Sequence, residues 1–325
     1  MNARRATTAQ EASLQAGSRR SGQHRMAELL EKLAVKEGVH SSPYLDGVTL
    51  GRCNQRRTKG PVLYEPSIVF VAQGRKRAYL GNRTYYYDPD HYLVVTLPMP
   101  FECETEASVA EPLLAFSVEV DVAVLNELLM KIDPRTLRKP GANAVHGMYV
   151  APMNEELSDA AIRLLQCMLD PIEAKVLGPS IIREITYHVL VGENGGALCD
   201  IMAINGRVAQ IQRAIERMHA ECHQPLDIQT LADEASMSPS AFHHNFKALT
   251  ATSPLQYMKT IRLHKAKLLM LNEGTSAGAA AARVGYESAS QFSREFKRFF
   301  GESPVAEVAR TREILGLNHP VLAVD

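Results

Sequence analysis

The residue types that most often carry chemistry are sparsely placed in this sequence. None of its five cysteines forms a C-x-x-C pair, which argues against a disulfide framework and against a zinc finger. His91 and, further along, His146 are accompanied by no His-x-His pair, so we expect no metal site. The glycine-rich residues 192–196 follow a helical pattern rather than a strand, so they form no phosphate-binding loop. We therefore expect neither an enzyme nor a cofactor.

Cys53 is a thiol with a basic sequence neighbourhood, because three arginines lie within four positions of it. A thiolate near cations is reactive, so a sensor of oxidants or electrophiles is one interpretation and a buried, inert thiol is the other. Cys103 and His91 complete the candidate ligand-binding residues. No fuller description of a ligand pocket follows from the sequence.

A repeat with an offset of 50 residues is the most informative pattern. Residues 238–254 (SPSAFHHNFKALTATSP) and 288–304 (SASQFSREFKRFFGESP) are identical at seven positions, where about one identity is expected by chance. The chain therefore contains two copies of one supersecondary unit.

Each copy has the pattern of two short helices joined by a tight turn. The first helices are expected over residues 228–235 and 277–284, and Ser238 and Ser288 are placed to cap the second helices. Pro239 stands at the favoured first helical position. Two short helices separated by three or four residues indicate a helix-turn-helix unit.

The second helix of each copy has one apolar and one polar face. The phenylalanine pairs at 242 and 246 and at 292 and 296 are spaced to face a core, which turns the polar side chains outward. Short polar side chains near the start of such a helix are typical of major-groove readers, and lysines further along can contact phosphate. The predicted DNA contacts are Ser240, His243, His244, Lys247, Ser290, Ser293, Arg294 and Lys297.

The segment between the copies supports paired DNA reading. Residues 255–271 have a helical pattern, and 17 residues make about 26 Å of helix. With its flanking turns, this helix can separate two recognition helices by roughly 34 Å, which is one DNA turn. Residues 206–312 contain 14 Lys and Arg and 10 Asp and Glu, a net charge of +4 to which the linker helix contributes Lys259, Arg262, Lys265 and Lys267.

The residues before the repeat indicate a β domain with flanking helices. Short strand patterns with turns at close spacing suggest an all-β barrel or sandwich. The expected strands are residues 67–72, 76–80, 83–87, 91–97 and 113–120. Amphipathic helices are expected over residues 26–37, after Asp121, over 154–169 and over 179–191. The last two either pack on their own domain or pair with another protomer.

Length and net charge limit the classes of protein to which the chain can belong. The chain has 325 residues, which indicates two domains, and 36 basic and 36 acidic residues give it no net charge. This excludes a wholly basic chromatin-type protein and an acidic disordered chain. No apolar run approaches the roughly 20 residues needed to cross a bilayer, so we expect no membrane partner and a cytoplasmic location.

Residues 281–304 (AARVGYESASQFSREFKRFFGESP) resemble the signature of AraC/XylS-type transcription regulators. Residues 64–66 (YEP), 71–76 (VAQGRK) and 81–95 resemble the N-terminal sensor domain of one subgroup of that family. The resemblance adds Ala289 to the DNA contacts. Two departures stand out: arginine is common where His244 stands, and the aromatic residue often found three positions after Pro304 is missing.

The resemblance implies an α+β multidomain protein. An N-terminal cupin-like β-barrel with flanking helices would precede a C-terminal all-α domain, in which a linker helix joins two helix-turn-helix units. The expected parts are a disordered tail (1–25), a sensor and dimerisation domain (26–195), a linker (196–206), a DNA-binding domain (207–312, with units at 228–247 and 277–297) and a second tail (313–325).

We accordingly expect a sequence-specific, ligand-responsive transcription regulator. Its implied partners are double-stranded DNA, a small-molecule effector, RNA polymerase and a second copy of the chain. The alternatives are a cupin-type enzyme fused to a DNA-binding module and a thiol-based redox or electrophile sensor.

Overall fold

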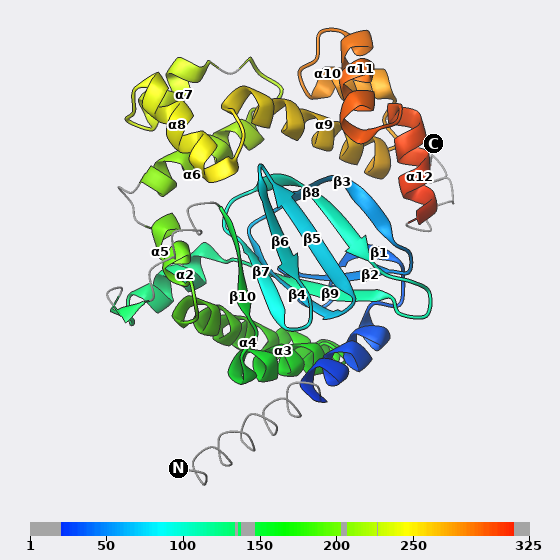
Figure 1. Cartoon of the computed structure of the whole chain (residues 1–325), viewed down its shortest axis with the longest axis vertical. Coiled ribbons are helices and arrows are strands. Elements are labelled where there is room, and N and C mark those ends of the chain that lie inside the picture. Colours follow the sequence, from blue (N-terminus) through cyan, green and yellow to red (C-terminus); the bar gives the residue numbers. More distant parts are fainter. Residues whose placement is uncertain (1–20, 134–135, 138–146, 203–206, 226, 315–325) are drawn as a thin grey trace, which may run out of the picture.

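The computed structural model describes residues 21–133, 136–137, 147–202, 207–225 and 227–314. Its β domain contains two antiparallel sheets (Figure 1). The first sheet has the order β1 (Gly38–Ser41), β2 (Val48–Cys53), β9 (Leu113–Glu119), β4 (Ser67–Gln73), β7 (His91–Val95) and β10 (Met148–Pro152). The second has the order β3 (Arg57–Tyr64), β8 (Met99–Glu106), β5 (Arg75–Leu80) and β6 (Arg83–Tyr87).

The six-stranded sheet is buried on both faces. Along β4, Ile68 and Phe70 belong to a core shared with helices, whereas Val69 and Val71 belong to a core shared with the four-stranded sheet. This follows from the two-residue period of a strand, which sends successive side chains to opposite faces. The polar residues of the domain consequently gather on the outer face of the smaller sheet.

The expected α+β multidomain class is confirmed, with one correction. The strands form two sheets rather than one closed barrel, and each sheet ends in edge strands: β1 and β10 on one, β3 and β6 on the other. The Pro61 ring explains why β3 stays at an edge, since a proline has no amide hydrogen to donate to a second neighbour.

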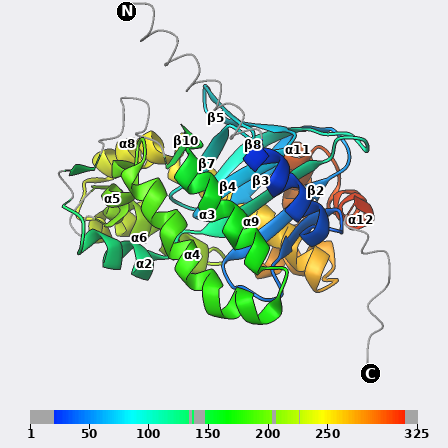
Figure 2. The same ribbon diagram turned by 90° about the horizontal axis from the view of Figure 1, so that it is seen from below.

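Helices cover the outer face of the six-stranded sheet (Figure 2). They are a helix over residues 21–33, α2 (Val122–Leu129), α3 (Glu155–Cys167), α4 (Pro171–Val191) and α5 (Gly196–Met202). The side chains of Asp121, Asn154 and Asp170 accept hydrogen bonds from the first free amides of α2, α3 and α4. These caps satisfy groups that have no partner within a helix.

Three boundaries in this part of the chain differ from the expected ones. Residues 21–25 are already helical rather than part of a tail. The segment expected to be a linker contains α5, whose Leu198 is fully buried. The helix expected from Pro179 begins eight residues earlier, at Pro171, and contains Pro179 in its interior.

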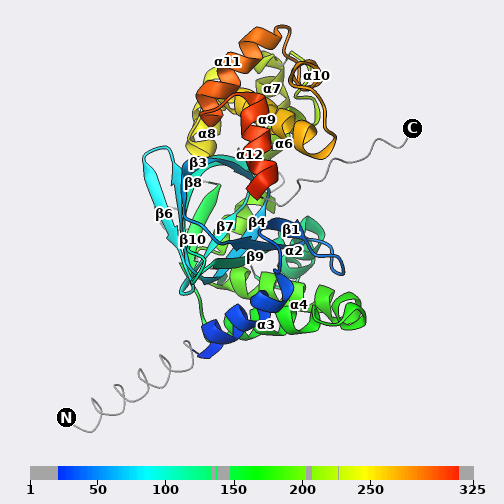
Figure 3. The same ribbon diagram turned by 90° about the vertical axis from the view of Figure 1, so that its right-hand side faces the viewer.

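Among the described residues from 207 onward all the elements are helices, and this C-terminal part lies over one end of the two sheets (Figure 3). Its helices are α6 (Arg207–Ala220), α7 (Ile228–Glu234), α8 (Pro239–Thr250), α9 (Pro254–Asn272), α10 (Ala277–Arg283), α11 (Ala289–Phe300) and α12 (Pro304–Ile314). Helix pairs α7–α8 and α10–α11 are the two predicted helix-turn-helix units, and α9 is the predicted linker helix.

The two units are attached to the rest of the molecule differently. Phe242 and Phe246 of the first unit belong to the same core as the inner faces of the sheets. Phe292 and Phe296 of the second unit belong to a separate core with α9 and α12. The first unit is therefore continuous with the β domain, and the second has a core of its own.

Tyr257 of α9 joins the β domain to the helical part. Its hydroxyl donates to the Pro98 carbonyl at 2.5 Å and lies 3.0 Å from His219 Nε2 of α6. The backbone amide of Gly147 also donates to the Leu249 carbonyl at the end of α8, at 3.0 Å. The bonds to Pro98 and from Gly147 cross between the two parts, at a place where Tyr257 is fully buried.

In the part of the chain that the structure describes, no helix is both long enough and apolar enough to cross a membrane.

Candidate nucleic-acid interface

The recognition helices α8 and α11 present their predicted faces to solvent. Ser238 and Ser288 cap them by accepting hydrogen bonds from the amides of Ala241 and Gln291. The phenylalanine pair of each helix is fully buried, which fixes the rotation of the helix about its axis. All nine predicted contact residues are exposed: Ser240, His243, His244, Lys247, Ala289, Ser290, Ser293, Arg294 and Lys297.

On α8 these side chains border a common space. Ser240, His243, His244 and Lys247 line an open surface hollow together with Ala248. The four polar residues carry hydroxyl, imidazole and ammonium groups, which can donate hydrogen bonds to base edges and phosphates. The geometry thus gathers the first copy's predicted contacts on one side of one helix.

Both turns place a residue in the left-handed region, but with different residue types. Gly285 has φ +84° and Ser236 has φ +53°. Glycine adopts this conformation freely, whereas serine has a Cβ that opposes it. A Cβ added to Gly285 would also overlap the backbone carbonyl of His223. The second turn therefore requires glycine for two reasons, and the first tolerates serine.

Arg262 of α9 ties the turn of the second unit to the segment that leads into the first unit. Its guanidinium donates to three backbone carbonyls: Cys222 at 2.6 Å, Gln224 at 2.8 Å and Gly285 at 3.2 Å. The first two lie in the segment between α6 and α7, and the third lies in the turn of the second unit. This planar five-donor group holds both segments against one helix.

The basic residues of the linker helix do not form part of the exposed face, contrary to the interpretation of their charge above. Lys259 pairs with Glu295 at 3.6 Å, and Lys267 pairs with the buried Glu307 at 2.5 Å. Lys265 donates to the backbone carbonyl of His219, and Arg262 is engaged as described. These four cations stabilise the packing of the helices.

The two lysines predicted to contact phosphate lie at the C-terminal ends of the recognition helices. Lys247 and Lys297 are exposed in the last turns of α8 and α11, and the exposed Arg298 stands beside Lys297. The sequence analysis did not include Arg298, although the adjacent Lys-Arg pair was a visible signal. Gln291 was also missed, and its amide donates to Glu295 at 3.1 Å.

The candidate ligand residues of the β domain are separated by the fold. Cys53 and Cys103 are buried between the two sheets. The Cys53 thiol accepts from Arg57 Nε at 3.0 Å, so the basic neighbourhood expected for it exists. His91 is the exposed first residue of β7, its Nδ1 lies 2.9 Å from Asp88 Oδ1, and it does not join the thiols. His146 lies outside the described residues.

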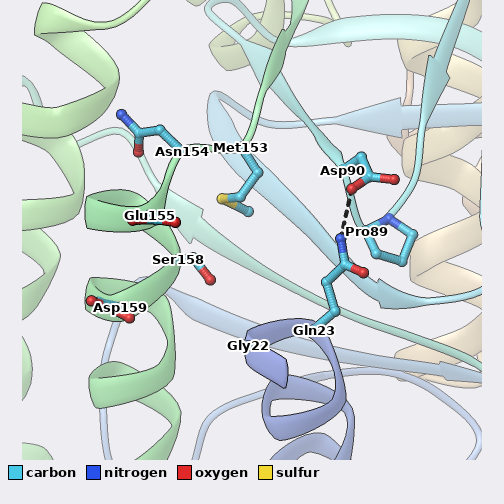
Figure 4. A pocket seen from close by; sticks show the side chains of 9 residues that line it. All are labelled: Gly22, Gln23, Pro89, Asp90, Met153, Asn154, Glu155, Ser158 and Asp159. Atoms are coloured by element: carbon cyan, nitrogen blue, oxygen red, sulfur yellow. Dashed lines mark hydrogen bonds between the residues drawn. The ribbon is translucent and has the colours of Figure 1, made fainter. Parts of the chain in front are cut away.

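A small pocket at the base of the molecule lies between the first helix, the β6–β7 turn and α3 (Figure 4). It has a volume of about 70 Å³, well below the roughly 300 Å³ at which pockets for organic ligands begin. Asp90, Glu155 and Asp159 line it, and the Gln23 amide donates to Asp90 at 2.7 Å. Among the described residues, no group of His, Cys, Asp or Glu has a metal-binding arrangement.

Two family matches cover most of the described chain. Residues 44–197 match the family described as the AraC-type transcriptional regulator N-terminus, and residues 231–310 match a helix-turn-helix domain.

Curated relatives match over parts of the chain. The transcriptional regulator AlkR of Acinetobacter baylyi is 34% identical over 29% of this chain and 31% of its own length. The arabinose operon regulatory protein of Escherichia coli is 26% identical over 35% of this chain and 46% of its own length. The chain thus spans about a third to a half of these relatives.

A solved structure shares the overall fold. ToxT of Vibrio cholerae, crystallised with an unsaturated fatty acid, aligns with a TM-score of 0.58 at 12% identity, over 80% of this chain and 94% of ToxT.

Proposed function

Because the chain belongs to the AraC-type transcriptional regulators, which bind DNA, we propose that it reads two adjacent major-groove segments with α8 and α11. The observation that carries this proposal is the repeated geometry of the two helices. Each is rotated by a buried phenylalanine pair so that its polar residues are exposed. We assign base reading to the exposed side chains in the first two turns and phosphate contact to Lys247 and Lys297.

We propose further that the β domain responds to a small organic effector. The core between its two sheets continues into the first helix-turn-helix unit, and this continuity supports the role. In this proposal, residues 26–195 sense the effector and residues 207–312 bind DNA, with RNA polymerase as the downstream partner. Effector binding would act by favouring one arrangement of the two parts over another. The role requires no catalysis by the β domain.

A second copy of the chain is the other proposed partner. One face of α4 packs on the six-stranded sheet, and the opposite face exposes large apolar side chains. These are Ile172, Val176, Leu177, Tyr187 and Val191. Exposed apolar patches of this kind mark contact surfaces, so α4 is the element we assign to dimerisation.

The experiment that tests the DNA-reading proposal is selection of genomic fragments by the purified full-length protein at near-physiological salt. The expected result is one recurrent motif with two half-sites about one helical turn apart, roughly 10 base pairs. Enrichment of a single half-site would show that only one unit reads bases. Uniform retention of random fragments would contradict sequence-specific reading.

A further inference from the structure

Lys76 is a charged residue placed among the inward-facing side chains of the β domain. It lies on β5, two residues before Ala78 and four before Leu80, which are both buried between the sheets. Because side chains alternate along a strand, Lys76 shares their inward face. Its ammonium group lies near Tyr64, Tyr87, Cys103 and Cys53.

Neighbouring cations of the same sheet have carboxylate partners, and Lys76 has none among the described residues. Lys59 pairs with Glu102 at 2.7 Å, and Arg77 pairs with Glu104 at 3.6 Å, on the outer face. Within the described part of the chain, no carboxylate lies within ion-pairing distance of Lys76. Its one hydrogen bond goes to the Tyr64 hydroxyl, at 2.6 Å.

Burial of an ammonium group without a carboxylate is unfavourable, since the charge loses its hydration. Such groups usually respond by losing the proton. Burial alone would lower the pKa of Lys76, but the neighbouring Tyr64 and Cys103 outweigh it and raise this pKa above its ordinary value. In its charged form the group keeps two N–H donors that no described residue accepts.

We infer that Lys76 anchors a carboxylate of the small-molecule effector between the two sheets, an inference that rests on the proposed function of the β domain. The Tyr64 hydroxyl is placed to donate a second hydrogen bond to the same carboxylate. The surrounding inner faces are apolar, as at Val71, Leu93 and Phe101, so the effector is a monocarboxylate with an apolar body.

The effector would reach the Lys76 ammonium past the side chain of Tyr64. This residue is the last of β3, an edge strand that pairs only with β8, and it is itself only partly buried. Movement of its side chain opens the ammonium to a ligand without breaking a strand pair. Since the same core contains Phe246 and Tyr257, occupancy at Lys76 is transmitted by direct packing to the first helix-turn-helix unit.

The first test needs no ligand. Lys76→Met in the full chain removes a partly buried charge that has no carboxylate partner among the described residues, and it should raise the Tm by about 2–4 °C. Lys76→Gln is the second variant, and Lys36→Met, at an exposed lysine, is the matched control expected to leave the Tm unchanged. A lower Tm for both Lys76 variants would show that the lysine stabilises the fold, which would overturn the inference.

The second test uses decanoate and benzoate as probes, with 1-decanol and benzamide as uncharged counterparts. At least one acid should raise the Tm of the wild-type chain and of Lys36→Met, and should leave both Lys76 variants unchanged. No shift with either acid, or equal shifts in Lys76→Met, would overturn the inference.

Two controls keep neighbouring hypotheses apart. DNA binding by the same protein is measured alongside, so that a chain that fails to bind DNA refutes the proposed function, whereas a DNA-binding chain indifferent to the acids refutes only the site. Loss of the acid response in Cys53→Ser or Cys103→Ser, but not in Lys76→Met, would assign sensing to the thiols instead.

Discussion

Arg294 and Lys297 stand three residues apart on α11, and we expect them to hold DNA in different ways. Arg294 lies in the second turn of the helix, where a guanidinium can bond a base edge in bidentate fashion. Arg294→Ala should weaken specific binding by about 1–3 kcal/mol and relax preference at one base position. Lys297→Ala should weaken binding to all sequences and lower the dependence of affinity on salt.

The measurement is titration of a specific and a random duplex at several salt concentrations. Lys259→Ala is the control for general loss of charge, because Lys259 pairs with Glu295 and should contribute little to binding. If Arg294→Ala and Lys297→Ala act equally on both duplexes, the assignment of base and phosphate contacts is wrong.

The two turn residues in the left-handed region should respond oppositely to substitution. Gly285→Ala adds a Cβ at φ +84° against the His223 carbonyl, so we expect it to lower the free energy of unfolding by more than about 2 kcal/mol. Ser236→Gly removes a Cβ at φ +53° and should change it by less than about 1 kcal/mol. Denaturant unfolding of both variants compares the turns, and a tolerated Gly285→Ala would contradict the observed packing.

At the scale of the elements, α4 combines a packing role with an exposed apolar face. Ile172→Glu and Val176→Glu place charges on that face, so a dimer formed through α4 should dissociate to monomers in light-scattering chromatography. Lys175→Glu changes an exposed residue between them and is the control. A dimer that survives the paired substitution must use another surface.

The strands show how far sequence pattern reaches. The five expected strands correspond to β4, β5, β6, β7 and β9, and the turn at residues 81–82 was correctly placed. β3 was missed because Gly60 and Pro61 interrupt its pattern, which an edge strand tolerates. β8 was missed although Met99, Phe101, Cys103 and Thr105 alternate inward, since the intervening glutamates obscured the run. β1, β2 and β10 were also missed.

α4 shows where tertiary contacts override local preference. Proline favours the first turn of a helix, and the sequence offers this position at both Pro171 and Pro179. The helix uses Pro171, because Ala174 and Gly178 before Pro179 are buried against the β domain. Pro179 itself lies on the exposed side. Burial of this face, which no local pattern encodes, decides where the helix begins.

The exposed faces of α8 and α11 were more predictable than the inside of the β domain. A strict repeat fixes which face of α8 and α11 is apolar, and the nine predicted residues are all exposed. Lys76 could not be recognised, because its inward direction depends on strand β5 and its missing carboxylate depends on residues far along the chain. Arg262 was misread for the same reason, since its three carbonyl partners come from distant segments.

At the scale of the whole molecule, the repeat provides a matched pair of core mutations. Phe246→Ala and Phe296→Ala each remove a fully buried ring at equivalent positions, at a cost of about 3–5 kcal/mol. Phe246→Ala should increase hydrogen exchange in α6–α8 and also in the strands that share its core. Phe296→Ala should increase it only in α10–α12 and the adjoining part of α9. Identical exchange patterns would contradict the division into two cores.

The buried His264 and the partly buried His219 should make the molecule sensitive to acid. Burial lowers the pKa of His219 to about 4 and that of His264 to about 3, with Lys265 and Lys267 adding repulsion. Both are neutral in the folded chain and gain a proton on unfolding, so stability is complete above the ordinary pKa of 6.5 and falls as the pH drops below it. At pH 5 each should cost about 1–2 kcal/mol.

Thermal unfolding between pH 7.5 and pH 5 measures this loss. His264→Phe keeps a ring against Phe299 and Phe300 and should remove its share of the loss. His243→Phe, at an exposed position, is the control and should retain the full loss. An equal pH dependence in all three proteins would show that His264 is not the group responsible.

One core runs from the sheets into the first helix-turn-helix unit, and this determines where the chain can be joined to a domain of another protein in a chimera. A chimera joined at residues 196–206, where the sensor was expected to end, would give the first unit a foreign partner for Phe246 and Tyr257. A chimera joined within α9, beyond Ile261, would carry over a unit whose core is complete. The second helix-turn-helix unit is therefore the part that can be transferred alone. Recombination at this point would change one proposed half-site of the DNA, while the first unit would stay attached to the β domain.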